Sequence, residues 1–151
     1  MKLKVIFLFI FLLIIAFSFY YFFKERKYTP GISFEMNKDS IETLNGEKSN
    51  EIVTLTIKKM DNKNIPTNFT IKFIPSDPDY AYPISVYTNE RIEEITTRTL
   101  IDMGSSDIIQ FKVFGKIMGN QPYSPYTIKI ELYYNNTKLA EKTLNVIVKR
   151  A

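Results

Sequence analysis

The 151-residue sequence contains neither cysteine nor histidine. The absence of cysteine excludes disulfide bonds, and the absence of both residues excludes thiolate and imidazole ligands for a metal ion. Catalytic arrangements that need a Cys nucleophile or a His base are excluded for the same reason. Glycine is scarce, and the five glycines are too scattered to form a phosphate-binding loop. We therefore expect neither an enzyme nor a bound cofactor.

Carboxylates remain as candidates for catalysis or cation binding. Glu93 and Glu94 are adjacent, so in an extended segment their side chains point to opposite faces and cannot flank one glycosidic bond. Asp77 and Asp79 lie in an Asp-Pro-Asp loop, but a hard cation needs six or more oxygen ligands and the spacing of an EF-hand is missing. We interpret these groups as turn and surface residues and predict no catalytic or metal site.

The excess of positive charge lies around one segment of the chain. Residues 1–27 contain five Lys or Arg and one Glu, whereas residues 28–151 carry 15 charges of each sign. A nucleic-acid-binding domain would need its excess of Lys and Arg on the folded part. We therefore exclude nucleic acid as a partner.

Residues 5–23 form an apolar run in which only Ser18 falls outside the hydrophobic residue types. As a helix the run would be about 28 Å long, close to the thickness of the hydrocarbon core of a bilayer. Because backbone polar groups in lipid must be paired within the segment, we predict a transmembrane helix with the lipid bilayer as its partner. Residues 1–4 then form a short basic N-terminus, and residues 24–31 form a basic juxtamembrane spacer.

Two other interpretations of the apolar run stay open. Lys2 and Lys4 could belong to a cleaved signal peptide, with Ala16 and Ser18 as the small residues before the cut. The hydrophobic residues that continue past Ser18 favour an uncleaved anchor instead. The run could also be a helix that is buried in a partner complex.

The flanking charges do not decide how the chain crosses the membrane, because two lysines precede the run and three basic residues follow it closely. Two Asn-X-Thr triplets, at Asn68 and Asn135, are candidate glycosylation sites and favour an outside location. Together with the β-rich pattern of the C-terminal part of the chain, they predict a single-pass cell-membrane protein with its C-terminal domain outside.

After residue 28 the dominant pattern is alternation of apolar and polar residues, which indicates half-buried β-strands. Asn135-Asn136 lies between two such runs and predicts a tight hairpin turn, since Asn tolerates positive φ. The runs, including three weaker ones, are 32–36, 53–57, 69–73, 84–87, 95–101, 109–113, 128–132 and 144–148.

About seven or eight short strands with one apolar face each need a second apolar face to pack against. A single antiparallel sheet would leave its apolar face in water. We therefore predict an all-β domain over residues 32–149, an immunoglobulin-like antiparallel β-sandwich that follows the transmembrane helix.

Residues 53–73, two alternating runs joined by an Asn-rich turn, resemble the first long hairpin of small Ig-like modules on archaeal and bacterial surfaces. These modules include S-layer-associated and cell-adhesion-related domains. Residues 103–113 and 126–130 are similar to later parts of such modules, in which a turn precedes one strand and a tyrosine begins another. The resemblance implies an extracytoplasmic binding or structural module and brings no catalytic residue.

Two loops, residues 74–83 and 120–126, combine proline with tyrosine. Proline lowers the entropy cost of ordering a loop, and tyrosine offers a large contact area with few rotamers. Tyr80, Tyr82, Tyr123 and Tyr126 are therefore candidate recognition residues. The alternative is that Tyr80, Tyr82 and Tyr126 fill the open ends of the sandwich.

These observations favour a membrane-anchored protein that presents an Ig-like domain for protein or glycan contact in the cell envelope. The alternative is an accessory subunit of a surface machine, such as a filament or a secretion apparatus. A pilin is disfavoured because the apolar run carries no acidic residue. A surface hydrolase is the third hypothesis, and the sequence offers it no His, no Cys and no convergent pair of acids.

Overall fold

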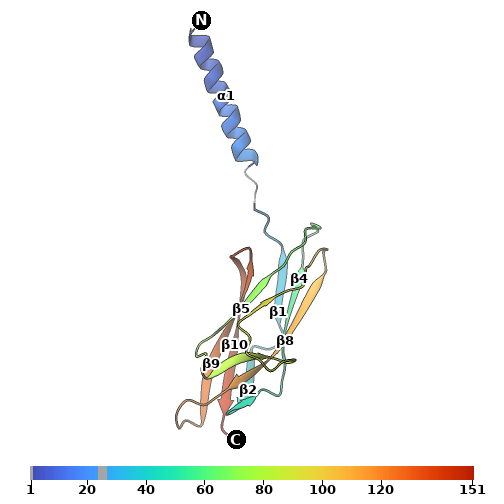
Figure 1. The fold of residues 1–151 in the computed structure, drawn as a ribbon, viewed down its shortest axis with the longest axis vertical. Coiled ribbons are helices and arrows are strands. Elements are labelled where there is room, and N and C mark those ends of the chain that lie inside the picture. The colour runs from blue at the N-terminus through green and yellow to red at the C-terminus, as the bar shows by residue number, and fades with distance from the viewer. Residues whose placement is uncertain (1, 24–26) are drawn as a thin grey trace.

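The computed structural model describes residues 2–23 and 27–151, and within these ranges it contains one helix and ten strands (Figure 1). The helix is α1 (Lys2–Phe23). The strands are β1 (Ile32–Met36), β2 (Ser40–Leu44), β3 (Glu47–Lys48), β4 (Val53–Lys59), β5 (Thr70–Pro75), β6 (Ala81–Ser85), β7 (Glu94–Thr96), β8 (Ser106–Gly115), β9 (Tyr123–Tyr134) and β10 (Thr137–Lys149).

Helix α1 covers the whole apolar run and also includes Lys2 and Lys4. None of its residues is buried, although nearly all of them are Leu, Ile, Val, Phe or Tyr. The helix is long and apolar enough to cross a membrane, a property that some signal sequences share.

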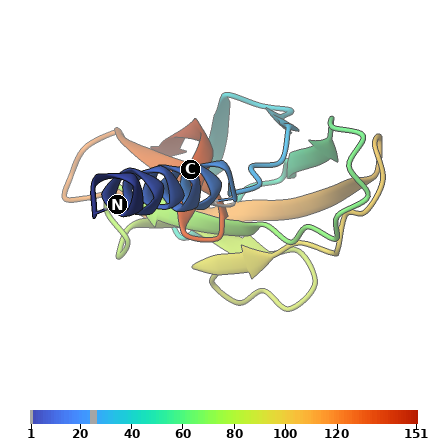
Figure 2. The same cartoon turned by 90° about the horizontal axis from the view of Figure 1, so that it is seen from above.

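The strands form two sheets that pack face to face (Figure 2). The first sheet has the order β1-β4-β8-β3, with β6 as an additional partner of β8 over residues 111–115, and the second has the order β2-β10-β9-β5-β7. The alternation seen in the sequence sends one face of each long strand inward. Val53, Leu55 and Ile57 of β4 are fully buried in this way, in the same core cluster as inward residues of β9 and β10.

The predicted hairpin at Asn135-Asn136 is confirmed. Tyr134 pairs directly with Thr137, and both asparagines have positive φ angles, 45° and 65°. This is the backbone conformation that a two-residue turn requires between strongly twisted strands. The turn joins β9 to β10, the two longest strands of the second sheet.

The prediction of a purely antiparallel sandwich with seven or eight strands is wrong in two respects, because β2 and β10 are parallel and the described residues form ten strands. β2 is not among the strands predicted from the sequence. Its inward positions are only Ile41 and Thr43, and the Thr43 hydroxyl donates to the Glu47 carbonyl at 2.9 Å. A strand with one apolar inward residue gives too weak an alternation to be recognised, and β3 has only two residues.

Candidate functional site

The end of the sandwich at which the chain enters from residue 27 is built around a buried lysine. The alternation that buries Val53, Leu55 and Ile57 continues to Lys59, so the stem of this side chain points into the sandwich and is completely inaccessible to solvent. Its Nζ donates to the Ile65 carbonyl at 2.6 Å and to the Ile101 carbonyl at 2.9 Å. Lys59 therefore ties two loops to the end of β4.

Asp61 connects this lysine to the segment that precedes β1. One carboxylate oxygen, Oδ1, lies 3.9 Å from the Lys59 Nζ. The other, Oδ2, accepts the Tyr28 hydroxyl at 2.7 Å and the Gly31 amide at 2.9 Å. Pro30, between these two residues, is buried. The described part of the predicted spacer, residues 27–31, is thus fastened to the sandwich.

The Tyr28 ring completes the arrangement. Lys63 Nζ lies 5.2 Å and Lys59 Nζ 5.9 Å from the ring centroid, both within the range of a cation–π interaction. Tyr134, next to the β9–β10 turn, meets the ring edge-on at 6.0 Å. We call Tyr28, Lys59, Asp61, Lys63 and Tyr134 the Lys59 cluster.

Two groups in the Lys59 cluster have shifted pKa values. Burial opposes ionisation of Asp61, but the hydrogen bonds from the Tyr28 hydroxyl and from the amides of Gly31 and Lys63, with the charge of Lys59, outweigh burial and lower the Asp61 pKa. Burial, together with the hydrogen bond to Asp61, raises the pKa of Tyr28. At neutral pH the cluster therefore contains an ionised carboxylate and a neutral phenol.

The second candidate region is the edge of β8 that faces away from β4. β8 pairs with β4 over residues 106–111, whereas β6 covers its other side only over residues 111–115. The Lys59 amide donates to the Ser105 carbonyl, and hydrogen-bonded pairs alternate along an antiparallel ladder, so Asp107 and Ile109 also bond toward β4. The backbone groups of Ser106, Ile108 and Gln110 then point the other way.

Among the strands that the structure describes, none pairs with the side of residues 106–110 that faces away from β4. The Ile108 amide is satisfied by the Asp107 carboxylate at 2.9 Å. The remaining outward groups of Ser106, Ile108 and Gln110 have no strand partner, so they form an exposed edge of the kind to which an extended peptide can add. We call this stretch the open β8 edge.

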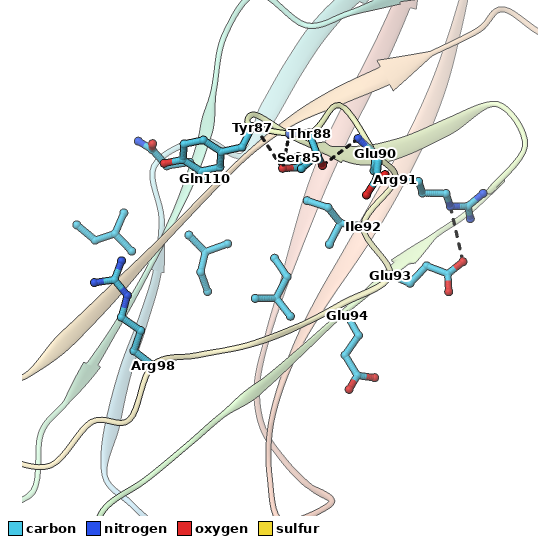
Figure 3. A pocket seen from close by; sticks show the side chains of 13 residues that line it. Ser85, Tyr87, Thr88, Glu90, Arg91, Ile92, Glu93, Glu94, Arg98 and Gln110 are labelled. Carbon is cyan, nitrogen blue, oxygen red and sulfur yellow. Dashed lines mark hydrogen bonds and ion pairs between the residues drawn. The ribbon is translucent and has the colours of Figure 1, made fainter.

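A hollow of about 410 Å³ lies beside the open β8 edge (Figure 3). Ile92, Ile95 and Ile109 give it an apolar lining. Its rim carries two ion pairs, Arg91–Glu93 at 4.0 Å and Arg98–Asp107 at 3.8 Å. Tyr87, Gln110 and Arg98 also line the hollow (Figure 3).

The predicted recognition tyrosines do not form one surface. Tyr80 and Tyr126 stack at 6.4 Å, and the Tyr126 hydroxyl donates to the Lys116 carbonyl at 2.8 Å, which leaves the ring 7% exposed. Tyr82 instead stacks on Phe114 at 5.1 Å, with the Arg91 guanidinium 5.1 Å from its ring. Tyr123, at the start of β9, is 56% exposed.

The other candidate residues lie on the surface. Asn68 and Asn135 are exposed, and Asn135 lies in the turn next to the Lys59 cluster, so the asparagines of both triplets are accessible. The carbonyl of Asp77 accepts the amides of Tyr80 and Ala81, as in a turn. Within residues 2–23 and 27–151, no three acidic side chains gather in a way that could hold a metal ion.

Lys59 is not among the site residues predicted from the sequence, although the sequence contains a signal for it. Every second residue of β4 from Val53 to Ile57 faces the interior. Lys59 is the next residue in this alternation, so the pattern predicts that it also faces the interior. A buried lysine needs acceptors for its ammonium group, and these come from loops distant in the sequence. Their approach is a tertiary property that periodicity does not reveal.

Comparisons with known proteins give similarities of fold. No family model matches the sequence, and no curated protein matches it. The chain is similar to a PapD-like domain of human CEP192, with 14% identity over 85% of this chain and 92% of that chain, at a TM-score of 0.48. It is also similar to the CARDB domain of the PF1109 protein from Pyrococcus furiosus, with 11% identity over 80% of this chain and 93% of that chain, at 0.44.

Domains 4 and 5 of the S-layer protein SbsC are a further similar structure, with 12% identity over 78% of this chain and 46% of that chain, at a TM-score of 0.39. The structural neighbours thus include PapD-like domains, S-layer protein domains and a CARDB domain. At these levels of identity and TM-score, the similarities carry no information about function.

Proposed function

We propose that the chain is a single-pass membrane protein of the cell envelope whose Ig-like β-sandwich stands outside the cell, close to the bilayer, and binds another envelope protein. One observation carries the proposal: a fully exposed apolar helix is followed, after a few residues, by a segment that is fastened to the sandwich. An exposed helix of this composition needs lipid or a partner around it.

The dimensions support an anchor. The 22 residues of α1 give a helix of about 33 Å, enough to cross a hydrocarbon core of about 30 Å. Cleavage after Ser18 would leave five apolar residues, Phe19–Phe23 in sequence, on a water-exposed domain. An intact anchor leaves no such tail and explains the basic residues at 24, 26 and 27 as its polar boundary.

The open β8 edge supports protein rather than glycan contact. Its unpaired backbone groups suit an extended peptide, and the apolar lining of Ile92, Ile95 and Ile109 could receive alternate side chains of that peptide. We infer no hydrolytic activity here. Glu93 is paired with Arg91, and Glu94 is the adjacent residue at the start of β7, so the two side chains point to opposite faces of an extended segment and do not converge.

Membrane fractionation combined with mass measurement tests the proposal. The protein should remain in the membrane pellet after alkaline carbonate extraction and should have the mass of the uncleaved chain, 17.7 kDa. A shorter species in the soluble fraction would contradict it and indicate a cleaved signal peptide. Reproducible co-purification with components of one surface machine would favour the alternative role of accessory subunit.

A further inference from the structure

We propose that the sandwich makes a second contact with the bilayer that holds α1, through the tips of two loops beside the Lys59 cluster. The contact residues are Ile65 on one loop and Ile101 and Met103 on the other. They lie in the headgroup interface, so the domain stands end-on on the membrane. This inference rests on the proposed membrane anchor.

The three side chains are exposed despite being apolar. The exposed fraction is 62% for Met103, 46% for Ile101 and 39% for Ile65. Both loops lie at the end of the domain where the chain enters from residue 27, shown at the top of the sandwich in Figure 1. Apolar side chains grouped at one end of a domain are typical of a contact with lipid or protein.

The loops hold these tips in place. Lys59 binds the carbonyl groups of Ile65 and Ile101. The turn at Met103 is fixed by the Gly104 amide, which donates to the Lys59 carbonyl at 2.8 Å, and by the Ser105 amide, which donates to the Asp102 carbonyl at 3.0 Å. Gly104 has a φ of 86°, which only glycine adopts without strain. A preorganised tip binds with a smaller loss of conformational entropy than a mobile one.

The covalent tether identifies the bilayer as the occupant of this surface. Tyr28 lies five residues after Phe23, so a fully extended chain separates the two by at most about 18 Å. The headgroup region beyond the hydrocarbon core is about 5–8 Å thick on each side. Since the Tyr28 ring lies 5.9 Å from the Lys59 ammonium that holds both loops, the loops are within reach of the headgroups.

The charges around the tips favour anionic headgroups. Lys27 and Lys63 are exposed in the described part of this end, and Lys24 and Arg26 precede them in the sequence. Basic residues near a membrane surface are attracted to anionic lipids. Asp102, beside Met103, opposes this attraction. We therefore expect the apolar tips to drive the contact and the lysines to strengthen it.

Tryptophan fluorescence can test this contact directly, because the chain contains no tryptophan of its own. The Met103→Trp variant of the full chain is reconstituted in phosphatidylcholine vesicles and in vesicles with added phosphatidylglycerol. Lipids brominated near the headgroup serve as quenchers. Tyr123→Trp is the matched control, since Tyr123 is similarly exposed and lies in sequence at the start of β9 rather than in either loop.

We expect blue-shifted emission from the Met103→Trp variant and quenching at least twofold stronger than for Tyr123→Trp. Quenching in both lipid mixtures would support a contact driven by the apolar tips, and quenching only with phosphatidylglycerol would support one that depends on the lysines. Water-like emission with equal, weak quenching of both variants would overturn the inference.

Two further measurements distinguish a missing second contact from a missing anchor and from an effect of the tryptophan itself. Flotation of the protein with the vesicles reports the anchor independently, so a protein that floats without quenching leaves the proposed function intact and removes only the second contact. A nitroxide attached to a Met103→Cys variant repeats the test without an aromatic side chain, because the chain has no other cysteine. A nitroxide more accessible to aqueous nickel than to oxygen would also overturn the inference.

Discussion

The Lys59 cluster and the open β8 edge are neighbours in the structure, but they differ in how their polar groups are satisfied. Ser105 accepts a hydrogen bond from the Lys59 amide, and the next residue, Ser106, begins the unpaired edge. In the cluster a buried ammonium, a carboxylate and a phenol all have partners, and among the described residues no buried side-chain N or O atom lacks one. Along the edge, alternate backbone groups remain open to water or to a partner.

This difference distinguishes a region whose geometry is fixed from a region that is available for binding. Satisfying a buried charge requires several segments to meet in one geometry, so the Lys59 cluster fixes how the sandwich follows the juxtamembrane segment. An unpaired strand edge costs little in water, because water satisfies its backbone groups, and it can bind without rearrangement of the core. We expect substitutions in the cluster to change stability and changes at the edge to alter binding.

The largest effect is expected for Lys59→Met. This substitution keeps the apolar stem but leaves the Ile65 and Ile101 carbonyls and the Asp61 carboxylate without their cation, which should cost about 3 kcal/mol of unfolding free energy. Denaturant unfolding of the protein in detergent, followed by circular dichroism, measures the change. Lys58→Met is the matched control, because Lys58 is the adjacent exposed residue of the same strand and should change stability by less than about 0.5 kcal/mol. Equal stabilities of the two variants would remove the cluster's structural role.

Amide hydrogen exchange should reveal the alternation along β8. The amides of Asp107, Ile109 and Phe111 bond toward β4, whereas that of Gln110 points to the open side. Gln110 should therefore exchange about 100-fold faster than Ile109, as measured by NMR on the native protein. Equal protection of these two amides would mean that the edge is covered. Protection of Gln110 that appears only when a peptide is added would identify that peptide as a strand partner.

The stability that Asp61 contributes should depend on pH in the acid range. Its pKa is lowered in the folded state, so this contribution is fully present above the ordinary carboxyl pKa of about 4 and is lost as the pH falls through the lower folded value. Asp61→Asn should therefore lower the melting temperature at pH 7 and have a smaller effect at pH 2. A difference in melting temperature that does not change between pH 7 and pH 2 would contradict this role of the carboxylate.

Tyr28→Phe should have the smallest effect. The substitution keeps the ring that contacts Tyr134 and removes only the hydrogen bond from the hydroxyl to Asp61, which should cost about 0.5–1 kcal/mol. Thermal unfolding measures the difference from the parent protein. A loss above about 2 kcal/mol would indicate that the hydroxyl does more than fasten the juxtamembrane segment.

Periodicity predicted most of the fold because most strands have one clear apolar face. The bounds 32–36 match β1, the run 53–57 lies within β4, and the turn at Asn135-Asn136 is where it was expected. Only β2, with Ile41 as its single apolar inward residue, and the two-residue β3 gave too little pattern to be found. The parallel pairing of β2 with β10 depends on where the chain crosses between sheets, which periodicity does not report.

Less of the candidate site could be predicted. Lys59 is recognisable as an inward-facing lysine only when the alternation of β4 is followed to the last residue of the strand. Its acceptors lie on two loops, and the sequence does not show that these loops come together. The open β8 edge arises because the chain turns away after Ser85, so that β6 stops short of Gln110. Such an edge depends on the length of a neighbouring strand, so the sequence of β8 itself contains no signal for it.

Cysteine labelling on intact cells tests the central claim most directly, because the chain has no cysteine of its own. One variant carries Asn50→Cys on the exposed surface of the sandwich, and the other carries Lys2→Cys at the start of α1. A membrane-impermeant maleimide should label the Asn50→Cys variant on intact cells and the Lys2→Cys variant only after lysis. Labelling of Asn50→Cys only after lysis would place the sandwich inside the cell and contradict the account.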